Sequence, residues 1–180
     1  MNGTTHAGQG MVGNEGVAGV RRTGESGDDM APLECKEEAS ALEFAFISEH
    51  NLAGEVLRSA IAFSSRFGVH PHHISIVLRE LLKNAIVHGN EEDAAQRVWC
   101  RIDASHPGMV SVTVRDAGEG FNYHILDLRL PEQPGELEHR GYKLINAYAD
   151  RLEFNKKGNE VTAFLRAPSE HPLPDPTGAG

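Results

Sequence analysis

Residues 80–90 read E-L-L-K-N-A-I-V-H-G-N and are the most informative stretch of the chain. Glu80, Asn84 and His88 recur at every fourth residue, so in a helix they drift by only about 40° per step and share one face. Leu81 and Ala85 lie on the neighbouring face, which suits a hydrophobic core. The stretch therefore predicts a helix that presents a carboxylate, an amide and an imidazole beside a core.

A second informative stretch, D-A-G-E-G-F, spans residues 116–121. Asp116 ends an alternating run of valines and polar residues that predicts a strand. Gly118 and Gly120 then free the backbone to turn. A polar helix stripe and an aspartate at a strand end with a glycine loop together suggest a nucleotide pocket. The loop is not the dinucleotide fingerprint, because that needs G-x-G-x-x-G at the start of a helix.

Size and charge narrow the classes of function. The 180 residues suffice for one domain with a core, and 39% are hydrophobic and 24% charged, as in a soluble globular protein. The net charge of −9 argues against direct binding of nucleic acid, since phosphate binding needs a basic face. An acidic chain is compatible with a basic protein partner.

Targeting signals and cysteine motifs are not evident. No apolar run approaches the roughly 18 residues that span a membrane, and the N-terminus does not resemble a signal peptide. We therefore expect a cytoplasmic protein without a membrane segment. Cys35 and Cys100 form no C-x-x-C pair, which favours ordinary thiols in a reducing compartment.

The chain divides into three regions. Residues 1–37 are predicted to be a disordered tail, because the first 32 contain eight glycines and no aromatic residue. Residues 38–167 form the predicted folded domain. Residues 168–180 carry four prolines and are predicted to be an extended tail.

Periodicity within the folded domain predicts an α+β fold. Strands are expected at 42–47, 98–104, 109–116, 152–154 and 160–166, and helices at 51–67, 71–88 and 141–149. Residues 122–140 are irregular and predict a lid or binding loop. Because the strands outnumber the helices and occur as hairpins, we expect a two-layer sandwich: a mixed, mainly antiparallel sheet with helices on one face.

The two informative stretches resemble known motifs. Residues 80–90 look like the N box of the GHKL (Bergerat) ATPase superfamily, which includes gyrases and histidine kinases, and 116–121 look like its G1 box. Residues 140–162, R-G-Y-K-L-I-N-A-Y-A-D-R-L-E-F-N-K-K-G-N-E-V-T, are similar to its G2 region and final hairpin. The H-G-N after the N box and the A-D-x-L-x-F ending resemble one branch, the anti-sigma-factor serine/threonine kinases. The resemblance covers about residues 40–167.

This resemblance implies a site for ATP and Mg²⁺. By position, Glu80 would be the general base, Asn84 would hold the metal, and Asp116 would accept a hydrogen bond from the adenine amino group. Gly118 and Gly120 would bring the backbone close to the nucleotide.

The third helix and the final hairpin would complete the site. Gly141 would lie beside the phosphates at a helix N-terminus, and Arg140 or Lys143 would add positive charge. Asn159 stands where the family has a threonine that supports the adenine site. His139 replaces the first glycine of the G2 box, which puts nucleotide binding or lid closure in question.

The sequence leaves several functions open. The first is a serine/threonine kinase and anti-sigma factor that binds a sigma factor or phosphorylates a small STAS-type antagonist. It would have no nucleic acid or membrane partner, and a homodimer stays open. The alternative is a non-catalytic module that binds ATP, or has a degenerate site, and acts by capturing partners. A detached histidine-kinase domain ranks lower, because no dimerisation hairpin precedes residue 40.

The roles of the histidines also stay open. His88 either packs at the helix end or acts in catalysis. His70, His72 and His73 are interpreted as surface residues, because no acidic or cysteine partner accompanies them.

Overall fold

The structure, a computed structural model, describes residues 31–128 and 140–167. The predictions for the two tails therefore fall outside it over residues 1–30 and 168–180, as does most of the predicted lid, over residues 129–139. In chain order the elements are β1 (Leu33–Glu37), β2 (Ala41–Ile47), α1 (His50–Ser65), α2 (Pro71–Lys83), the π-helical turn η1 (Asn84–Gly89), β3 (Arg97–Asp103), β4 (Met109–Arg115), the 3₁₀ turn η2 (Tyr123–Ile125), α3 (Arg140–Tyr148), β5 (Arg151–Phe154) and β6 (Glu160–Arg166).

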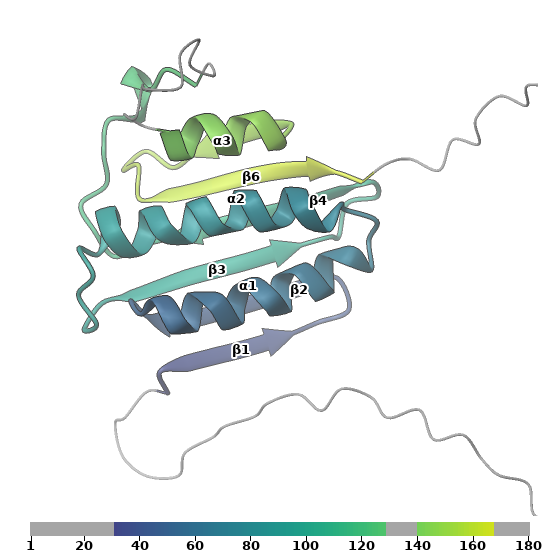
Figure 1. Ribbon diagram of the computed structural model, residues 1–180, viewed down its shortest axis with the longest axis horizontal. Helices are drawn as coiled ribbons and strands as arrows, with labels where there is room; N and C mark the ends of the chain where they lie inside the picture. Colours follow the sequence, from purple (N-terminus) through teal and green to yellow (C-terminus); the bar gives the residue numbers. More distant parts are fainter. Residues whose placement is uncertain (1–30, 129–139, 168–180) are drawn as a thin grey trace, which may run out of the picture.

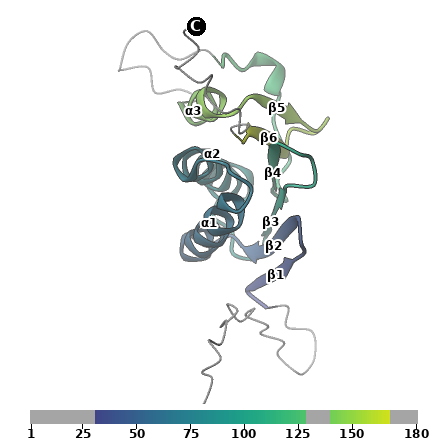
Figure 2. The same cartoon turned by 90° about the vertical axis from the view of Figure 1, so that its right-hand side faces the viewer.

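The strands form one sheet in the order β1-β2-β3-β4-β6-β5 (Figure 1, and Figure 2 for β5). Every neighbouring pair is antiparallel, so within the described ranges the sheet lacks the parallel pairing that a mixed sheet would contain. Figure 2 shows α1, α2 and α3 on one side of the sheet. The two-layer α+β sandwich predicted from the sequence is confirmed.

The core lies between the helices and the inner face of the sheet. Alternate residues of β2, β3, β4 and β6 are buried, while the residues between them remain more exposed. Burial of large apolar side chains from both layers supplies the main stabilisation of such a sandwich. Its fully buried large side chains include Phe46, Ile74, Leu78, Leu82, Ile102, Ile145 and Leu165.

The first strand corrects the predicted N-terminal boundary. Leu33–Glu37 pairs with β2 along its whole length, with Leu33 opposite Phe46 and Glu37 opposite Leu42. The ordered domain therefore begins at residue 33 or earlier, and the prediction of disorder up to residue 37 was wrong for this strand. The sequence pattern of this strand is weak because an edge strand buries few side chains. Every residue of β1 after the first is exposed.

The ends of the first two helices follow local chemistry. Gly68, at φ +79°, lies just beyond the end of α1, in the left-handed conformation that glycine takes readily. Pro71 is the first residue of α2, and Nδ1 of His70 accepts a hydrogen bond from the His72 amide at 3.2 Å. These helix ends agree with the sequence prediction to within two residues.

The histidines at this end are exposed, as predicted. The imidazoles of His70, His72 and His73 pack around one another, and those of His72 and His73 also contact the Tyr148 ring of α3. Across residues 31–128 and 140–167, no group of three or more histidine, cysteine or acidic side chains is arranged to hold a metal.

The predicted helix 71–88 changes pitch before it ends. The regular α-helix stops at Lys83, and the Asn90 amide donates to the Ala85 carbonyl at 2.8 Å, five residues back. Single π turns of this kind often occur at functional sites, because they rotate the following residues relative to a regular helix. Here Asn84 is the first residue of the turn, and Asn90, the residue after the turn, is buried in the protein interior.

Asn90 connects four parts of the fold. Its side chain is fully buried, and Nδ2 donates to Oγ of Ser48 at 2.7 Å and to the carbonyl of Arg97 at 3.1 Å. Its Oδ1 accepts the Ala117 amide at 2.8 Å. The end of η1 is thereby tied to the ends of β2 and β4 and to the start of β3, which fixes where the loop after β4 begins.

Replacement of Asn90 by alanine should destabilise the protein by about 2–4 kcal/mol, because the amide of Ala117 and the other partners would be left unpaired. Urea denaturation followed by circular dichroism measures this loss. The matched control is Asn146→Ala on the exposed side of α3, where a change within about 0.5 kcal/mol is expected. Equal stability of the two variants would contradict the role of Asn90.

Candidate nucleotide site

One open cavity of about 1130 Å³ lies at an end of the helical layer. It is enclosed by the end of α2, by η1, by the loop after β4, by the start of α3 and by the β5–β6 turn. Its lining contains both informative stretches of the sequence. The lining residues that carry the argument are Glu80, Lys83, Asn84, Asp116, Gly141 and Tyr142.

The polar stripe of the helix faces this cavity, as predicted. Glu80, Asn84 and His88 all line it, although His88 is exposed at the rim. The start of α3 lies directly over the first two: a methyl group on Gly141 would be 3.0 Å from Oε2 of Glu80 and 3.4 Å from Oδ1 of Asn84. The fold therefore brings the N-box and G2-box residues into contact.

Asn84 has an unused donor. Its Nδ2 is buried and has no hydrogen-bond partner of good geometry. Buried amide groups are nearly always paired, so an unpaired one at a cavity wall points to a missing ligand. An amide offers an oxygen to a hard cation and a donor to a phosphate oxygen, which fits a magnesium nucleotide.

Asp116 lines the same cavity from the end of β4. Its Oδ1 accepts the Gly118 amide at 2.9 Å, which leaves Oδ2 to face other donors. Burial raises the pKa of this carboxyl group above its ordinary value, and the Gly118 hydrogen bond only partly offsets that effect. A half-buried carboxylate with a free oxygen is suited to accept a hydrogen bond from an exocyclic amino group.

Two glycines form the wall behind Asp116. A methyl group on Gly89 would overlap with the Asp116 side chain, and one on Gly118 would overlap with the Gly89 carbonyl. From the sequence, Gly89 was predicted only to end a helix. Its second role is a close contact across 27 residues of sequence, which no local pattern reveals.

The glycines of the next loop also meet other backbone segments. Gly120 and Gly158 adopt φ +75° and +80°, and methyl groups there would overlap with carbonyl groups of Lys157 and Phe121 respectively. Gly120 was predicted to bring the backbone close to a nucleotide. The structure shows that it also packs the loop after β4 against the β5–β6 turn.

Asn159 lies behind the site. Its Nδ2 donates to the Asp116 carbonyl at 2.9 Å, and its Oδ1 accepts from Nδ2 of Asn155 at 2.8 Å. Both polar atoms are therefore used within the protein, and Asn159 is absent from the cavity wall. It braces the backbone of Asp116 instead of offering a group to a ligand.

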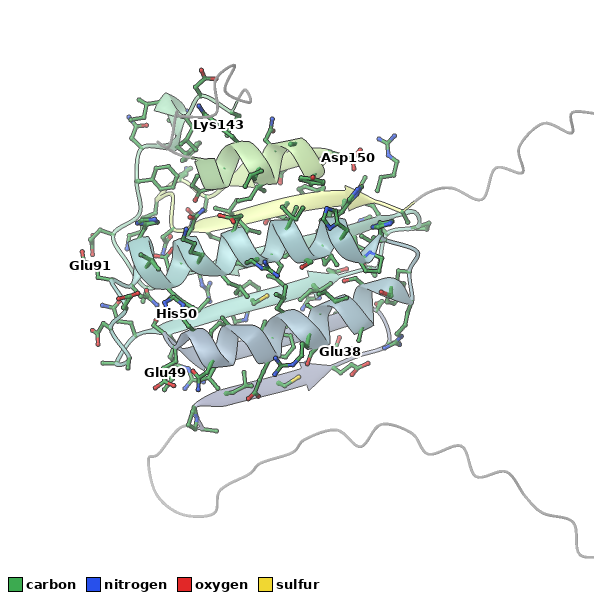
Figure 3. All side chains as sticks on the ribbon, in the orientation of Figure 1. Glu38, Glu49, His50, Glu91, Lys143 and Asp150 are labelled. Atoms are coloured by element: carbon green, nitrogen blue, oxygen red, sulfur yellow. The ribbon has the colours of Figure 1, made fainter. Side chains whose placement is uncertain are left out.

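The positive charges differ in position from the prediction. Lys83, which was not among the predicted site residues, lines the cavity next to Asn84. Lys143 does not line it, and Figure 3 shows this side chain on the side of α3 that faces away from α2. The side chain of Arg140 and the whole of His139 lie outside the described part of the chain.

Comparison with known families agrees with this geometry. A family model for the histidine kinase-like ATPase domain matches residues 47–165. The chain belongs to this family. The resemblance to the GHKL superfamily is thereby confirmed, whereas its anti-sigma-factor branch stays a prediction. No curated protein sequence matches the chain.

Membership of the histidine kinase-like ATPase family supports binding of ATP and an ATP-dependent, kinase-like activity. The cavity of this ATPase domain is large enough for a nucleoside triphosphate, since typical ligand pockets measure roughly 300–1,000 Å³. In the described part of the chain, none of the helices has the length and apolar character to cross a bilayer.

Asp116→Asn should weaken nucleotide binding and stabilise the ligand-free protein. The amide keeps the oxygen that accepts the Gly118 hydrogen bond but cannot offer a second carboxylate oxygen, so calorimetry should show at least a roughly tenfold loss in ATP affinity. Because the folded-state pKa is raised, ionised Asp116 costs stability above that pKa, and the cost vanishes below the ordinary value of 3.8. The melting temperature of the variant should exceed that of the wild type at neutral pH and approach it as the pH falls.

A lower melting temperature of Asp116→Asn at neutral pH would contradict this assignment. So would unchanged ATP affinity.

Gly89→Ala should weaken ATP binding and cost roughly 1–3 kcal/mol of stability, because the added methyl group overlaps with Asp116. Gly54→Ala is the matched control. A methyl group at Gly54 meets its nearest atom at 3.7 Å, within α1, so this variant should be more stable by about 0.5–1 kcal/mol. Calorimetry with ATP and urea denaturation test both, and normal ATP binding by Gly89→Ala would refute the close contact.

Proposed function

We propose that the protein is an ATP-dependent serine/threonine kinase and anti-sigma factor that acts on a small STAS-type antagonist in a partner-switching pathway. The observation that carries the proposal is the convergence of Glu80, Asn84 and Asp116 on one cavity. The family match supports the ATP-dependent part, and the motifs around residues 80–90 and 140–162 support the branch.

The proposed roles follow from chemistry and position. Asp116 would recognise the adenine amino group, and Asn84 would hold Mg²⁺, which would neutralise charge on the phosphates. Lys83 would add positive charge at the same wall. The amides at the start of α3, beginning at Gly141, would face the phosphates.

Glu80 would act as the general base. It lies one helical turn before Asn84 on the same face and lines the cavity, so a substrate hydroxyl entering there comes within reach of its carboxylate. Glu80 would take the proton of a serine or threonine hydroxyl as that oxygen bonds to the terminal phosphorus and ADP departs. Positioning of the substrates and neutralisation of the phosphate charge would supply the rest of the rate acceleration.

The charge of the chain supports a protein partner. A net charge of −9 disfavours nucleic acid and suits a basic surface on a sigma factor or an antagonist. We include a second copy of the chain among the partners. The strand β1 forms one edge of the sheet and would be the pairing edge in such a dimer.

Glu80→Gln tests the catalytic role. Purified protein, radiolabelled ATP and candidate STAS-type proteins should give phosphorylated antagonist, and the variant should transfer phosphate about 10²–10⁴-fold more slowly while binding ATP normally. Glu55→Gln, an exposed glutamate on α1, is the control and should retain full activity.

Undiminished transfer by Glu80→Gln would exclude Glu80 as the base. Normal ATP binding without phosphorylation of any antagonist would favour the non-catalytic module, which acts by binding partners.

A further inference from the structure

Gln96 lines the nucleotide cavity but has no part in the proposed reaction. Its side-chain Oε1 is buried and has no hydrogen-bond partner among the residues that the structure describes. Buried acceptors in proteins are nearly always paired with a protein group, a water or a ligand, so an unpaired one in a cavity wall points to a missing donor. The packing of the chain alone therefore does not account for this oxygen.

The amide group of Gln96 has a defined orientation. Its Nε2 donates to Oδ2 of Asp93 at 3.4 Å, and the reversed orientation would place the amide oxygen against that carboxylate. The backbone is held as well. The Gln96 amide donates to the Asp93 carbonyl at 3.0 Å, and the Gln96 carbonyl accepts from the amide and the hydroxyl group of Ser48, each at 3.1 Å. Oε1 is thus the polar atom of this side chain that remains for a ligand.

Gln96 and Asp116 continue the inner faces of two neighbouring strands. Buried side chains alternate along β3 from Val98 onward and along β4 up to Val114. Gln96 lies two residues before Val98, and Asp116 lies two residues after Val114, so each belongs to the buried row of its strand. Both side chains therefore start from the face of the sheet that carries the helices and the cavity.

The register of the two strands makes Gln96 and Asp116 diagonal neighbours. The last recorded pair at this end of the antiparallel ladder is Trp99 with Arg115. The same register, continued by three residues, puts Gln96 opposite Gly118, two residues from Asp116. Diagonal neighbours on one face of an antiparallel pair lie roughly 7–8 Å apart.

The buried Asn90 side chain holds the two strand ends in this register. It donates to the carbonyl of Arg97 at 3.1 Å and accepts from the amide of Ala117 at 2.8 Å. Arg97 follows Gln96, and Ala117 follows Asp116, so both acceptors are adjacent in sequence to residues that the same amide group binds. Their relative position is therefore fixed by the fold before any ligand enters.

Two acceptors arranged in this way match an amino group. The exocyclic amino group of adenine carries two hydrogens, which both lie in the plane of the base and point in different directions. Oδ2 of Asp116 is suited to accept one of them, and Oε1 of Gln96 is an acceptor without a donor. A base that lacks the amino group would leave both oxygens unpaired, which costs binding free energy.

We propose that Gln96 is a second specificity-determining residue of the nucleotide site, and that its Oε1 accepts the adenine amino hydrogen that Asp116 does not take. This inference rests on the proposed ATP site. It adds a residue that lies outside the three motif stretches at 80–90, 116–121 and 140–162.

Gln96→Met in the full chain tests the proposal, because methionine is also unbranched and of similar length but is only a weak acceptor. The two ligands are ATP and purine riboside triphosphate, which differs from ATP only by the missing amino group. Calorimetry should show that the variant binds ATP roughly fivefold to thirtyfold more weakly than the wild type. Purine riboside triphosphate should bind to both proteins with affinities within about twofold, because it has no hydrogen to give to Gln96.

A matched control and a stability measurement accompany this test. Glu55→Met places the same side chain at an exposed position of α1 and should bind both nucleotides as the wild type does. Urea denaturation of the ligand-free proteins should give Gln96→Met a midpoint no lower than that of the wild type, since the oxygen that is removed has no partner there. A lower midpoint, with equal weakening of both nucleotides, would show that Gln96 serves the fold, and it would refute the proposal.

The outcomes separate this inference from the proposed function. If Asp116→Asn weakens ATP binding but Gln96→Met binds ATP as the wild type does, the role of Gln96 is refuted and the ATP site stands. A loss of affinity in Gln96→Met that is confined to ATP supports the role. If the wild type binds neither nucleotide, both the ATP site and the inference fail.

Discussion

The site depends on one close contact between backbone segments, where the end of η1 meets the loop after β4. Gly89 and Gly118 allow the two segments to approach, and the buried Asn90 side chain fixes them through the Ala117 amide. The position of Asp116 follows from this contact, since Gly89 forms the wall against its side chain. A cavity between a helix stripe and a strand end exists because these two segments cannot separate without breaking buried hydrogen bonds.

The same region carries the features that cost stability. The Nδ2 donor of Asn84 is buried without a hydrogen-bond partner, and burial raises the pKa of the Asp116 carboxyl group above its ordinary value. Immediately after Asn90, two glutamates adopt left-handed backbone angles, Glu91 at φ 51° and Glu92 at φ 61°, each costing on the order of 1 kcal/mol. Such features persist only where the surrounding structure holds them in place, and in proteins generally they cluster at binding and active sites.

The two walls of the cavity differ in how firmly they are held. The wall formed by α2, η1 and β4 is continuous with the core. It is held by the hydrogen bonds of the Asn90 side chain and by the hydrogen bond that Asn159 donates to the Asp116 carbonyl. The wall formed by α3 is anchored at Ile145, but its first turn meets α2 through polar side chains.

The sequence by itself determined the layers of the fold and the principal residues of the site. Periods of two and of 3.6 residues report which face of each element is buried, and this local information was enough for β2 to β6 and the three helices. Spacing of four residues placed Glu80, Asn84 and His88 on one stripe, and the alternating run before Asp116 placed that residue at a strand end. Local pattern was not enough for β1, because an edge strand with mostly exposed side chains is defined by its pairing with β2.

Only the tertiary structure decided which residues meet across long separations in the chain. The change from α-helix to π turn at Asn84, the overlap of Gly89 with Asp116 and the use of Asn159 as a brace all depend on segments far apart in sequence. Periodicity records the average environment of a face, whereas hydrogen-bond geometry and close contact are set by the relative placement of whole elements after the core has packed.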